Sequence, residues 1–254
     1  MRKKYSLNTI NLVIRSLVFY LFLAVTLPIY CLILILISPF PLRYRFAVVI
    51  HFTHSSLWVL KVVCRIDHRL EGAENIPKNR NGVILSKHQS AWETFFLPEV
   101  FRDPAIITKR ELLWVPFFGW GFATIDPIAI NRSDTATAMD QINKKGKKCL
   151  EQGRWILVFP EGTRIPPGKI GKYRLGGARL AIAAGNYPIL PIAHNAGYFW
   201  GKNSFIKKPG TVRVVIGPLI ETINRSPEEV TEQAKNWIEN TILRIEKERQ
   251  DEYT

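Results

Sequence analysis

The first part of the chain is dominated by one long apolar run. No charged residue occurs between Arg15 and Arg43, and this stretch is longer than the roughly 20 residues that span a bilayer. A cleaved signal peptide has a shorter apolar region that ends in small residues, whereas here the proline-rich segment 38–41 follows. The pattern therefore predicts a retained membrane anchor over residues 1–42. Pro28 lies inside the run, so a single spanning helix and two half-length helices within one leaflet both fit.

Residues 44–65 are predicted to form a membrane-proximal helix that is apolar on all faces. His51 and His54 are three positions apart in it, so both could reach one metal ion. Because no carboxylate or third ligand lies nearby in the sequence, we favour histidines at an interface or in the core. No metal site is expected.

From Asp67 onward, short apolar runs alternate with helical stretches. This alternation is typical of the α/β class, and it predicts a largely parallel or mixed sheet flanked by helices. The expected strands are Ile66–Leu70, Gly82–Ser86, Ala105–Thr108, Thr124–Ile130, Trp155–Phe159, Ile189–Ala193 and Val212–Ile216. The expected helices between them are Ala91–Phe101, Thr135–Gln152 and Leu175–Ala184. The α/β core then covers residues 66–218 of a second domain, residues 43–254.

A last helix is predicted over residues 226–250. Ser226 is a good N-cap, Pro227 suits the first helical position, and Glu229 completes a capping box. The residues expected on its buried face are Val230, Ala234, Trp237, Thr241 and Ile245.

Charge narrows the choice of partners. The chain has 35 Lys and Arg against 21 Asp and Glu, a net charge of +14, which favours an anionic partner such as nucleic acid, a membrane or an anionic substrate. Residues 1–66 hold no acidic residue and these basic ones: Arg2, Lys3, Lys4, Arg15, Arg43, Arg45, Lys61 and Arg65. Because this excess surrounds the apolar run, membrane lipids are the expected partner and nucleic acid is the weakest candidate.

The three cysteines, Cys31, Cys64 and Cys149, are odd in number and far apart. They support neither a disulfide framework nor a cysteine-based zinc site, and a reducing compartment fits best.

Candidate chemistry begins with His88 and Glu93. They follow the expected strand Gly82–Ser86, and the carboxyl ends of strands are where an open parallel sheet presents its ligand site. A carboxylate that accepts a hydrogen bond from one imidazole nitrogen leaves the other nitrogen available as a general base. The spacing alone is a weak signal, because an acidic residue near a helix N-terminus is also favourable without any catalytic role.

A second polar group follows the expected strand Trp155–Phe159. Arg164 has the two-pronged geometry that suits phosphate, Thr163 adds a hydroxyl, and Gly162 permits close backbone approach. Lys109, at the end of another strand, adds a cation at the same edge. A tight turn at the strand end would explain the same residues without a ligand.

Several other kinds of enzyme chemistry lose support, because the chain contains no G-x-S-x-G elbow, H-E-x-x-H, P-loop or G-x-G-x-x-G motif. Instead, four ordered blocks between about Leu70 and Pro218 resemble the 1-acyl-sn-glycerol-3-phosphate acyltransferases, and K-H-Q-S-A-W-E-T-F resembles their bacterial branch. The blocks are 87–94, 108–112 with 115–119, 159–164 and 187–192.

The resemblance implies an O-acyltransferase in which His88 is the general base and Glu93 orients it. It also implies that Glu161, Gly162, Thr163 and Arg164 bind phosphate, with Lys109 as a further candidate. Glu93 departs from the family pattern, which has Asp, and its side chain is one methylene longer.

The implied reaction moves a fatty acyl group from a thioester, on coenzyme A or acyl carrier protein, to the sn-2 hydroxyl of lysophosphatidic acid, giving phosphatidic acid. No cofactor and no protein nucleophile are needed. The expected location is the bacterial cytoplasmic membrane, with the site on the cytoplasmic side. The alternatives are another lysolipid acceptor or a non-catalytic lipid-binding protein, which would have no use for a base pair.

Two further groups remain open at this point. The aromatic side chains Phe117, Phe118, Trp120 and Phe122 could line an acyl slot or pack in a core. The lysines Lys144, Lys145, Lys147 and Lys148 form either a solvated helix face or a surface for anionic lipid or for the phosphates of coenzyme A.

Overall fold

The computed structural model describes residues 7–131 and 135–251. Three of the basic residues that flank the predicted anchor, Arg2, Lys3 and Lys4, lie outside the described residues. The helices are α1 (Leu7–Leu36), α2 (Leu42–Cys64), α3 (Trp92–Phe101), α4 (Phe118–Ala123), α5 (Thr135–Glu151), α6 (Gly176–Ala183) and α7 (Pro227–Asp251), with short 3₁₀ helices at Ala73–Asn75, Arg110–Trp114 and Ala196–Tyr198.

The strands form one mixed sheet. They are β1 (Ile66–Glu71), β2 (Val83–Ser86), β3 (Ala105–Lys109), β4 (Ile128–Ile130), β5 (Ile156–Val158), β6 (Ile189–His194) and β7 (Gly210–Ile216), in the spatial order β1-β7-β6-β2-β5-β3-β4. Neighbouring strands in the run β6-β2-β5-β3-β4 are parallel. β7 pairs antiparallel with β6 and parallel with β1. The predicted fold class is confirmed.

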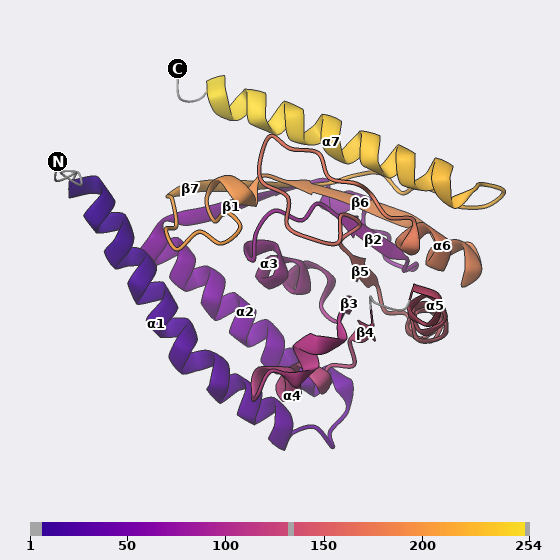
Figure 1. Ribbon diagram of the computed structural model, residues 1–254, viewed down its shortest axis with the longest axis horizontal. Coiled ribbons are helices and arrows are strands. Elements are labelled where there is room, and N and C mark those ends of the chain that lie inside the picture. The colour runs from indigo at the N-terminus through magenta and orange to yellow at the C-terminus, as the bar shows by residue number, and fades with distance from the viewer. Residues whose placement is uncertain (1–6, 132–134, 252–254) are drawn as a thin grey trace.

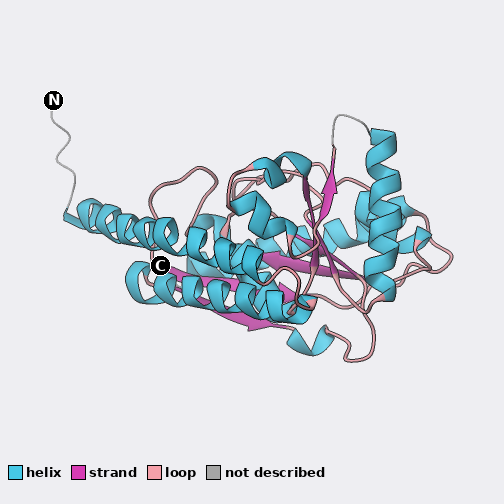
Figure 2. Cartoon of the chain, turned by 90° about the horizontal axis from the view of Figure 1, so that it is seen from below, coloured by secondary structure: helices cyan, strands magenta, loops and turns pink. Residues whose placement is uncertain are grey.

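Two helical layers cover the sheet. Successive strand residues point to opposite faces, so Val83 and Leu85 pack against α5, α6 and α7, whereas Ile84 packs against α1, α2 and α3. Figure 1 shows α7 above the sheet and α1 and α2 below it. In Figure 2 the N-terminal end of α1 projects beyond the rest of the molecule.

α1 continues through Pro28 as one helix, so the alternative of two half-length helices is wrong. α1 and α2 are each long and apolar enough to cross a membrane. Phe19 from α1 is fully buried in the same core cluster as α2 and α3. The division of the chain at residue 42 stays a prediction.

One strand begins later than expected. β4 starts at Ile128 rather than at Thr124, because α4 occupies Phe118–Ala123 and Asp126 adopts a left-handed backbone conformation with φ of 54° just before Pro127. Proline has no N–H to donate to the ladder, so the pairing of β4 with β3 begins only after Pro127, at Ile128.

α7 begins as its capping box predicts. The Ser226 backbone N–H donates to Glu229 Oε2 at 2.7 Å, and the Glu229 N–H donates to the Ser226 hydroxyl at 3.2 Å. Its fully buried side chains include Val230, Ala234 and Ile245.

Candidate active site

The turn between β2 and α3 brings His88 and Glu93 together. His88 Nδ1 lies 2.9 Å from Glu93 Oε1, and the same oxygen accepts the backbone N–H groups of Gln89 and Ser90 at 3.0 and 2.9 Å. Burial alone would raise the pKa of Glu93, but His194, His88 and the Ser90 N–H lower it below its ordinary value. A carboxylate accepts from Nδ1–H, so the partners assign the proton to Nδ1 and leave Nε2 as a proton acceptor.

The imidazole is held on further sides. The ring of His88 stacks on Phe159 with centroids 4.0 Å apart. The backbone N–H of His88 donates to Glu161 Oε2 at 2.9 Å, and the His88 carbonyl accepts from Ile165 N–H at 2.8 Å. His88 is therefore fixed to the turn that follows β5, which carries the residues predicted to bind phosphate.

A buried charge cluster lies behind this turn. Lys87 Nζ is 2.7 Å from Glu161 Oε1 and 2.7 Å from Glu239 Oε1 on α7, and the Tyr173 hydroxyl donates to Glu239 at 2.8 Å. The Lys87 side chain is only 1% exposed. Burial raises the pKa of Glu161, and Lys87 opposes that shift. Buried charges require such pairing, so this cluster joins α7 to the turns that carry His88 and Glu161.

Most, but not all, of the residues predicted to bind phosphate lie around one cavity. Gly162, Thr163, Arg164 and Lys109 line the same cavity as His88. Gly162 has φ of 69°, a conformation that favours glycine, and a Cβ there would lie 3.1 Å from the Arg174 guanidinium.

Glu161 is placed differently from its neighbours. Its side chain is fully buried and paired with Lys87, and Glu161 does not line the cavity that the next three residues share. Its carboxylate accepts the His88 backbone N–H and so holds the His88 turn.

The cavity has a volume of about 670 Å³ and two chemically different ends. Its polar part contains His88, Thr163, Arg164, Lys109 and Lys202. Its apolar wall comes mostly from α1, α2, α3 and α4 and from Ile125 after α4, and the helical residues include Leu23, Leu27, Cys31, Leu34, Val48, Val49, Phe52, Phe95, Phe118 and Phe122. An amphiphile with an anionic head and a hydrocarbon tail matches this division.

The aromatic segment before β4 divides between two environments. Phe118 and Phe122 line the cavity and stack on each other with centroids 5.6 Å apart. Phe117 and Trp120 are 55% and 53% exposed. Two of the four aromatic side chains thus fit the acyl-slot alternative, and two face outward.

The remaining predicted groups lie elsewhere. His51 bonds the Tyr30 hydroxyl, and His54 Nδ1 is 3.6 Å from Glu99 Oε2; within the described residues, no three His, Cys, Asp or Glu side chains are placed to hold a metal ion. The lysines on α5 are exposed, and Lys145 and Lys147 lie 3.7 and 4.0 Å from acidic partners. α5 packs on the face opposite α1–α3, which favours the solvated-face alternative.

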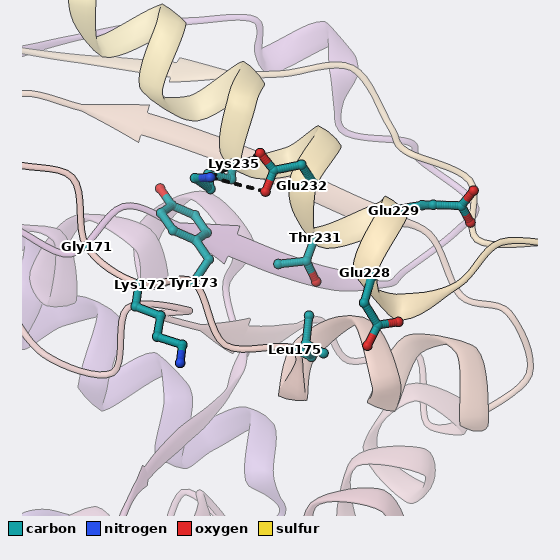
Figure 3. Close-up of a pocket in the computed structure, with 9 residues that line it drawn as sticks. All are labelled: Gly171, Lys172, Tyr173, Leu175, Glu228, Glu229, Thr231, Glu232 and Lys235. Atoms are coloured by element: carbon teal, nitrogen blue, oxygen red, sulfur yellow. Dashed lines mark hydrogen bonds and ion pairs between the residues drawn. The ribbon is translucent and has the colours of Figure 1, made fainter.

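A second hollow, of about 630 Å³, lies between residues 171–175 and the start of α7 (Figure 3). Its charged lining residues include Lys172 and Glu228, and the close-up shows Lys235 paired with Glu232 across one turn of α7. None of its lining residues is shared with the His88 cavity.

Sequence reasoning missed three residues of the site region: Glu239, which pairs with Lys87, His194, which lies beside the Lys87 carbonyl, and Lys202, which lines the cavity. No local sequence signal marks Glu239, because only the structure shows that it is buried beside Ile238 on α7. His194 ends β6, and its Nε2 lies 2.8 Å from the Lys87 carbonyl. The rule that selected His88, a polar residue at a strand end, would also have selected His194.

Comparison with known proteins adds the following. An acyltransferase family model matches residues 67–195. The 1-acyl-sn-glycerol-3-phosphate acyltransferase of Pseudomonas aeruginosa is 46% identical over 91% of this chain and 91% of its own. The protein of that name from Borreliella burgdorferi is 30% identical over 67% of each chain. The crystal structure of the 1-acyl-sn-glycerophosphate acyltransferase PlsC from Thermotoga maritima has a TM-score of 0.77 and 24% identity, covering 92% of this chain and 95% of the other. At that identity the likeness concerns the fold alone.

Proposed function

Because this chain belongs to the acyltransferase family of the 1-acyl-sn-glycerol-3-phosphate acyltransferases, we propose a specific reaction for it. A fatty acyl group moves from a thioester donor to the sn-2 hydroxyl of 1-acyl-sn-glycerol 3-phosphate, and phosphatidic acid forms. The observation that carries this proposal is the oriented His88–Glu93 pair at the polar end of an apolar cavity that also holds Arg164 and Lys109. An oriented base suits a hydroxyl nucleophile, and the two cations suit its phosphate.

In the proposed mechanism, His88 Nε2 accepts the proton of the sn-2 hydroxyl while the hydroxyl oxygen attacks the thioester carbonyl. The resulting tetrahedral intermediate collapses by breaking the carbon–sulfur bond, and the departing thiolate takes the proton back from His88. Glu93 stabilises the imidazolium that forms between these steps. No acyl-enzyme is involved, and no cofactor is required. Acyl-coenzyme A and acyl carrier protein both supply the thioester this route needs.

Within this proposal the residues after β5 have separate roles. Arg164 and Thr163 bind the acceptor phosphate, Lys109 adds a second cation, and Gly162 lets the backbone approach. Glu161 acts through other residues, because its carboxylate already holds Lys87 and the His88 backbone N–H.

The experiment that tests the substrate is substitution of Arg164. A guanidinium holds phosphate through two parallel hydrogen bonds that Lys cannot reproduce. We therefore expect Arg164→Ala to raise the KM for lysophosphatidic acid by about 10-fold to 100-fold, the equivalent of a charge-assisted hydrogen bond, and Arg164→Lys to raise it less. Steady-state kinetics with purified enzyme would measure both, and Lys109→Ala should act in the same direction more mildly.

The control is an acceptor that lacks the phosphate monoester, such as a lysolipid with a choline headgroup. Its use should already be poor and should fall little further in Arg164→Ala. Equal fractional losses on both acceptors would instead assign Arg164 a role in the loop structure and favour a different lysolipid.

For the membrane, we propose that α1 lies along one leaflet and does not cross the bilayer. The Ser16 hydroxyl accepts the Lys207 backbone N–H at 2.9 Å near one end of α1. Towards the other end, Gly121 packs so closely that a Cβ would lie 2.9 Å from the Cα of Cys31. A helix that contacts the same α/β domain at both Ser16 and Cys31 cannot also be surrounded by lipid at mid-bilayer.

The outer surface beside α1 supports the same placement. Trp114 is 68% exposed, and Phe117 and Trp120 are about half exposed. The indole rings of Trp114 and Trp120 have one polar edge, and such side chains favour the membrane–water interface. The site then lies at the surface of one leaflet, and we assign it to the cytoplasmic side of the bacterial inner membrane, where the thioester donors and a reducing environment for the buried cysteines are found.

This orientation predicts that both ends of α1 are accessible from one side of the membrane. Asn8→Cys and Ser38→Cys place a thiol at exposed positions near each end, and the native cysteines are buried. We expect an impermeant maleimide to label both variants in inverted vesicles and neither in right-side-out vesicles. Labelling from opposite sides would establish a spanning helix, and release of the full-length protein by high salt would contradict insertion altogether.

A further inference from the structure

Lys202 is a cation at the polar end of the cavity that the motif blocks do not include. It follows β6 and the 3₁₀ helix Ala196–Tyr198, and its Nζ lies 3.2 Å from the Thr163 hydroxyl. Among the described residues, neither Lys202 nor Arg164 forms an ion pair with a carboxylate. Two cations that line one cavity without a protein counter-charge favour an anionic ligand between them.

The loop that carries Lys202 is held in a defined shape. Ser204 N–H donates to the Gly201 carbonyl at 3.0 Å, and Asn203 has φ of 59°, so Lys202 lies at the tip of a tight turn. Lys208 N–H closes the base of the loop by donating to the Phe199 carbonyl at 2.8 Å.

The same loop is fastened to α1 by Lys207. The Lys207 ammonium is fully buried and lies 3.5 Å from the centroid of the Tyr20 ring and 4.5 Å from that of Trp200. Phe19 and Phe205 complete an aromatic box, with centroids 5.8 and 5.9 Å from Nζ. A desolvated ammonium is attracted to the faces of aromatic rings, so these contacts hold the loop against α1. We call this group the Lys207 box.

The Lys207 box is unusual because its cation has aromatic rings, and the Phe205 carbonyl at 3.0 Å, in place of a carboxylate. Burial lowers the pKa of Lys207 to about 8, so the side chain remains mostly charged at neutral pH. The Tyr20 hydroxyl donates to the carbonyl of Ser204, in the turn that carries Lys202, at 3.4 Å. The box on α1 and the polar end of the cavity are therefore neighbours.

We propose that Lys202 binds the phosphate of the acceptor together with Arg164, and that the Lys207 box positions Lys202 by clamping its loop to α1. This inference rests on the proposed function for the identity of the phosphate. In it, α1 is a structural part of the phosphate site as well as a membrane helix.

The first experiment replaces Lys202 by Gln in the full-length enzyme, with Lys208→Gln as the matched control. Lys208 is exposed in the same loop and does not line the cavity. We expect Lys202→Gln to raise the KM for lysophosphatidic acid by about 10-fold, as for one charge-assisted hydrogen bond, with a smaller change in kcat and none in the KM for the thioester. Lys202→Arg should restore most of the affinity. An unchanged acceptor KM, or a raised KM for the thioester alone, would overturn the proposal.

A binding measurement separates this inference from the reaction. Calorimetric titration of the detergent-solubilised protein with inorganic phosphate should give weaker binding for Lys202→Gln than for the wild type and Lys208→Gln. If the wild type fails to acylate lysophosphatidic acid but this difference remains, the proposed function fails and the phosphate site stands. Equal phosphate binding by all three proteins would refute the site.

The clamp is tested by Lys207→Met, which keeps an apolar stem in the box and removes the cation, and by the milder Ser16→Ala. Each should raise the acceptor KM in a protein that still unfolds cooperatively. Because both act through Lys202, the double variant Lys202→Gln/Lys207→Met should have the KM of Lys202→Gln alone. Multiplicative effects on KM, or no KM effect in either clamp variant, would show that the Lys207 box only stabilises the fold.

Discussion

His88→Ala should lower the rate of acyl transfer by about 10²-fold to 10⁴-fold, the usual contribution of a positioned general base. The variant should remain folded and membrane-bound, because the His88 side chain makes one hydrogen bond and one ring contact, whereas its backbone makes the bonds that fix the turn. Single-turnover assays on vesicles would measure the loss. His54→Ala is the matched control, since His54 also lies near a glutamate but is 74% exposed.

Glu93 variants separate orientation from charge. Glu93→Gln should lose activity less completely than His88→Ala, because the amide can still accept from Nδ1–H but no longer stabilises an imidazolium. Glu93→Asp keeps the charge and should retain more activity than Glu93→Gln. A Gln variant as active as the wild type would remove Glu93 from the mechanism, and near-normal turnover by His88→Ala would remove the base itself.

The parts of the site that sequence predicts are those built by short-range geometry. His88 and Glu93 are five positions apart across one turn, so their contact follows from a strand followed by a helix. The placement of Arg164 and Lys109 near each other can also be predicted, because parallel strands bring their carboxyl ends to one edge of the sheet. The four ordered motif blocks indicated the acyltransferase family, and the comparisons confirm that family.

The parts that sequence does not predict depend on contacts between distant segments. Lys87 and Glu239 are 152 positions apart, and nothing local in α7 indicates which buried partner its glutamate meets. Phe117 and Phe118 have the same chemistry, and only the backbone turn between them decides that one faces outward and the other lines the cavity. The direction of β7 also depends on the tertiary path, since its hydrophobic pattern suits either orientation.

Lys87→Met should have the largest effect on stability among the substitutions considered. It leaves Glu161 and Glu239 buried without their cation, and breaking a buried charge pair in this way costs about 3–5 kcal/mol. Lys169→Met is the matched control, because Lys169 is exposed and only its carbonyl lies near Lys87 Nζ. Denaturant unfolding of the detergent-solubilised proteins would measure the difference in the free energy of unfolding.

The pH dependence of that deficit identifies its cause. Burial already raises the pKa of Glu161, and removal of Lys87 would raise it further above the unfolded value. A carboxyl group whose pKa is higher in the folded than in the unfolded protein binds its proton more tightly when folded. The loss of folding stability caused by its buried charge is therefore full above the folded pKa and is relieved as the pH falls through that value. The stability gap between the wild type and Lys87→Met should therefore be larger at pH 8 than at pH 5. A gap that does not change with pH would mean that lost packing, and not an unpaired carboxylate, destabilises the variant.

Adding Glu161→Gln to Lys87→Met should recover part of the stability at pH 8, since it removes the uncompensated charge while its amide oxygen can still accept the His88 backbone N–H.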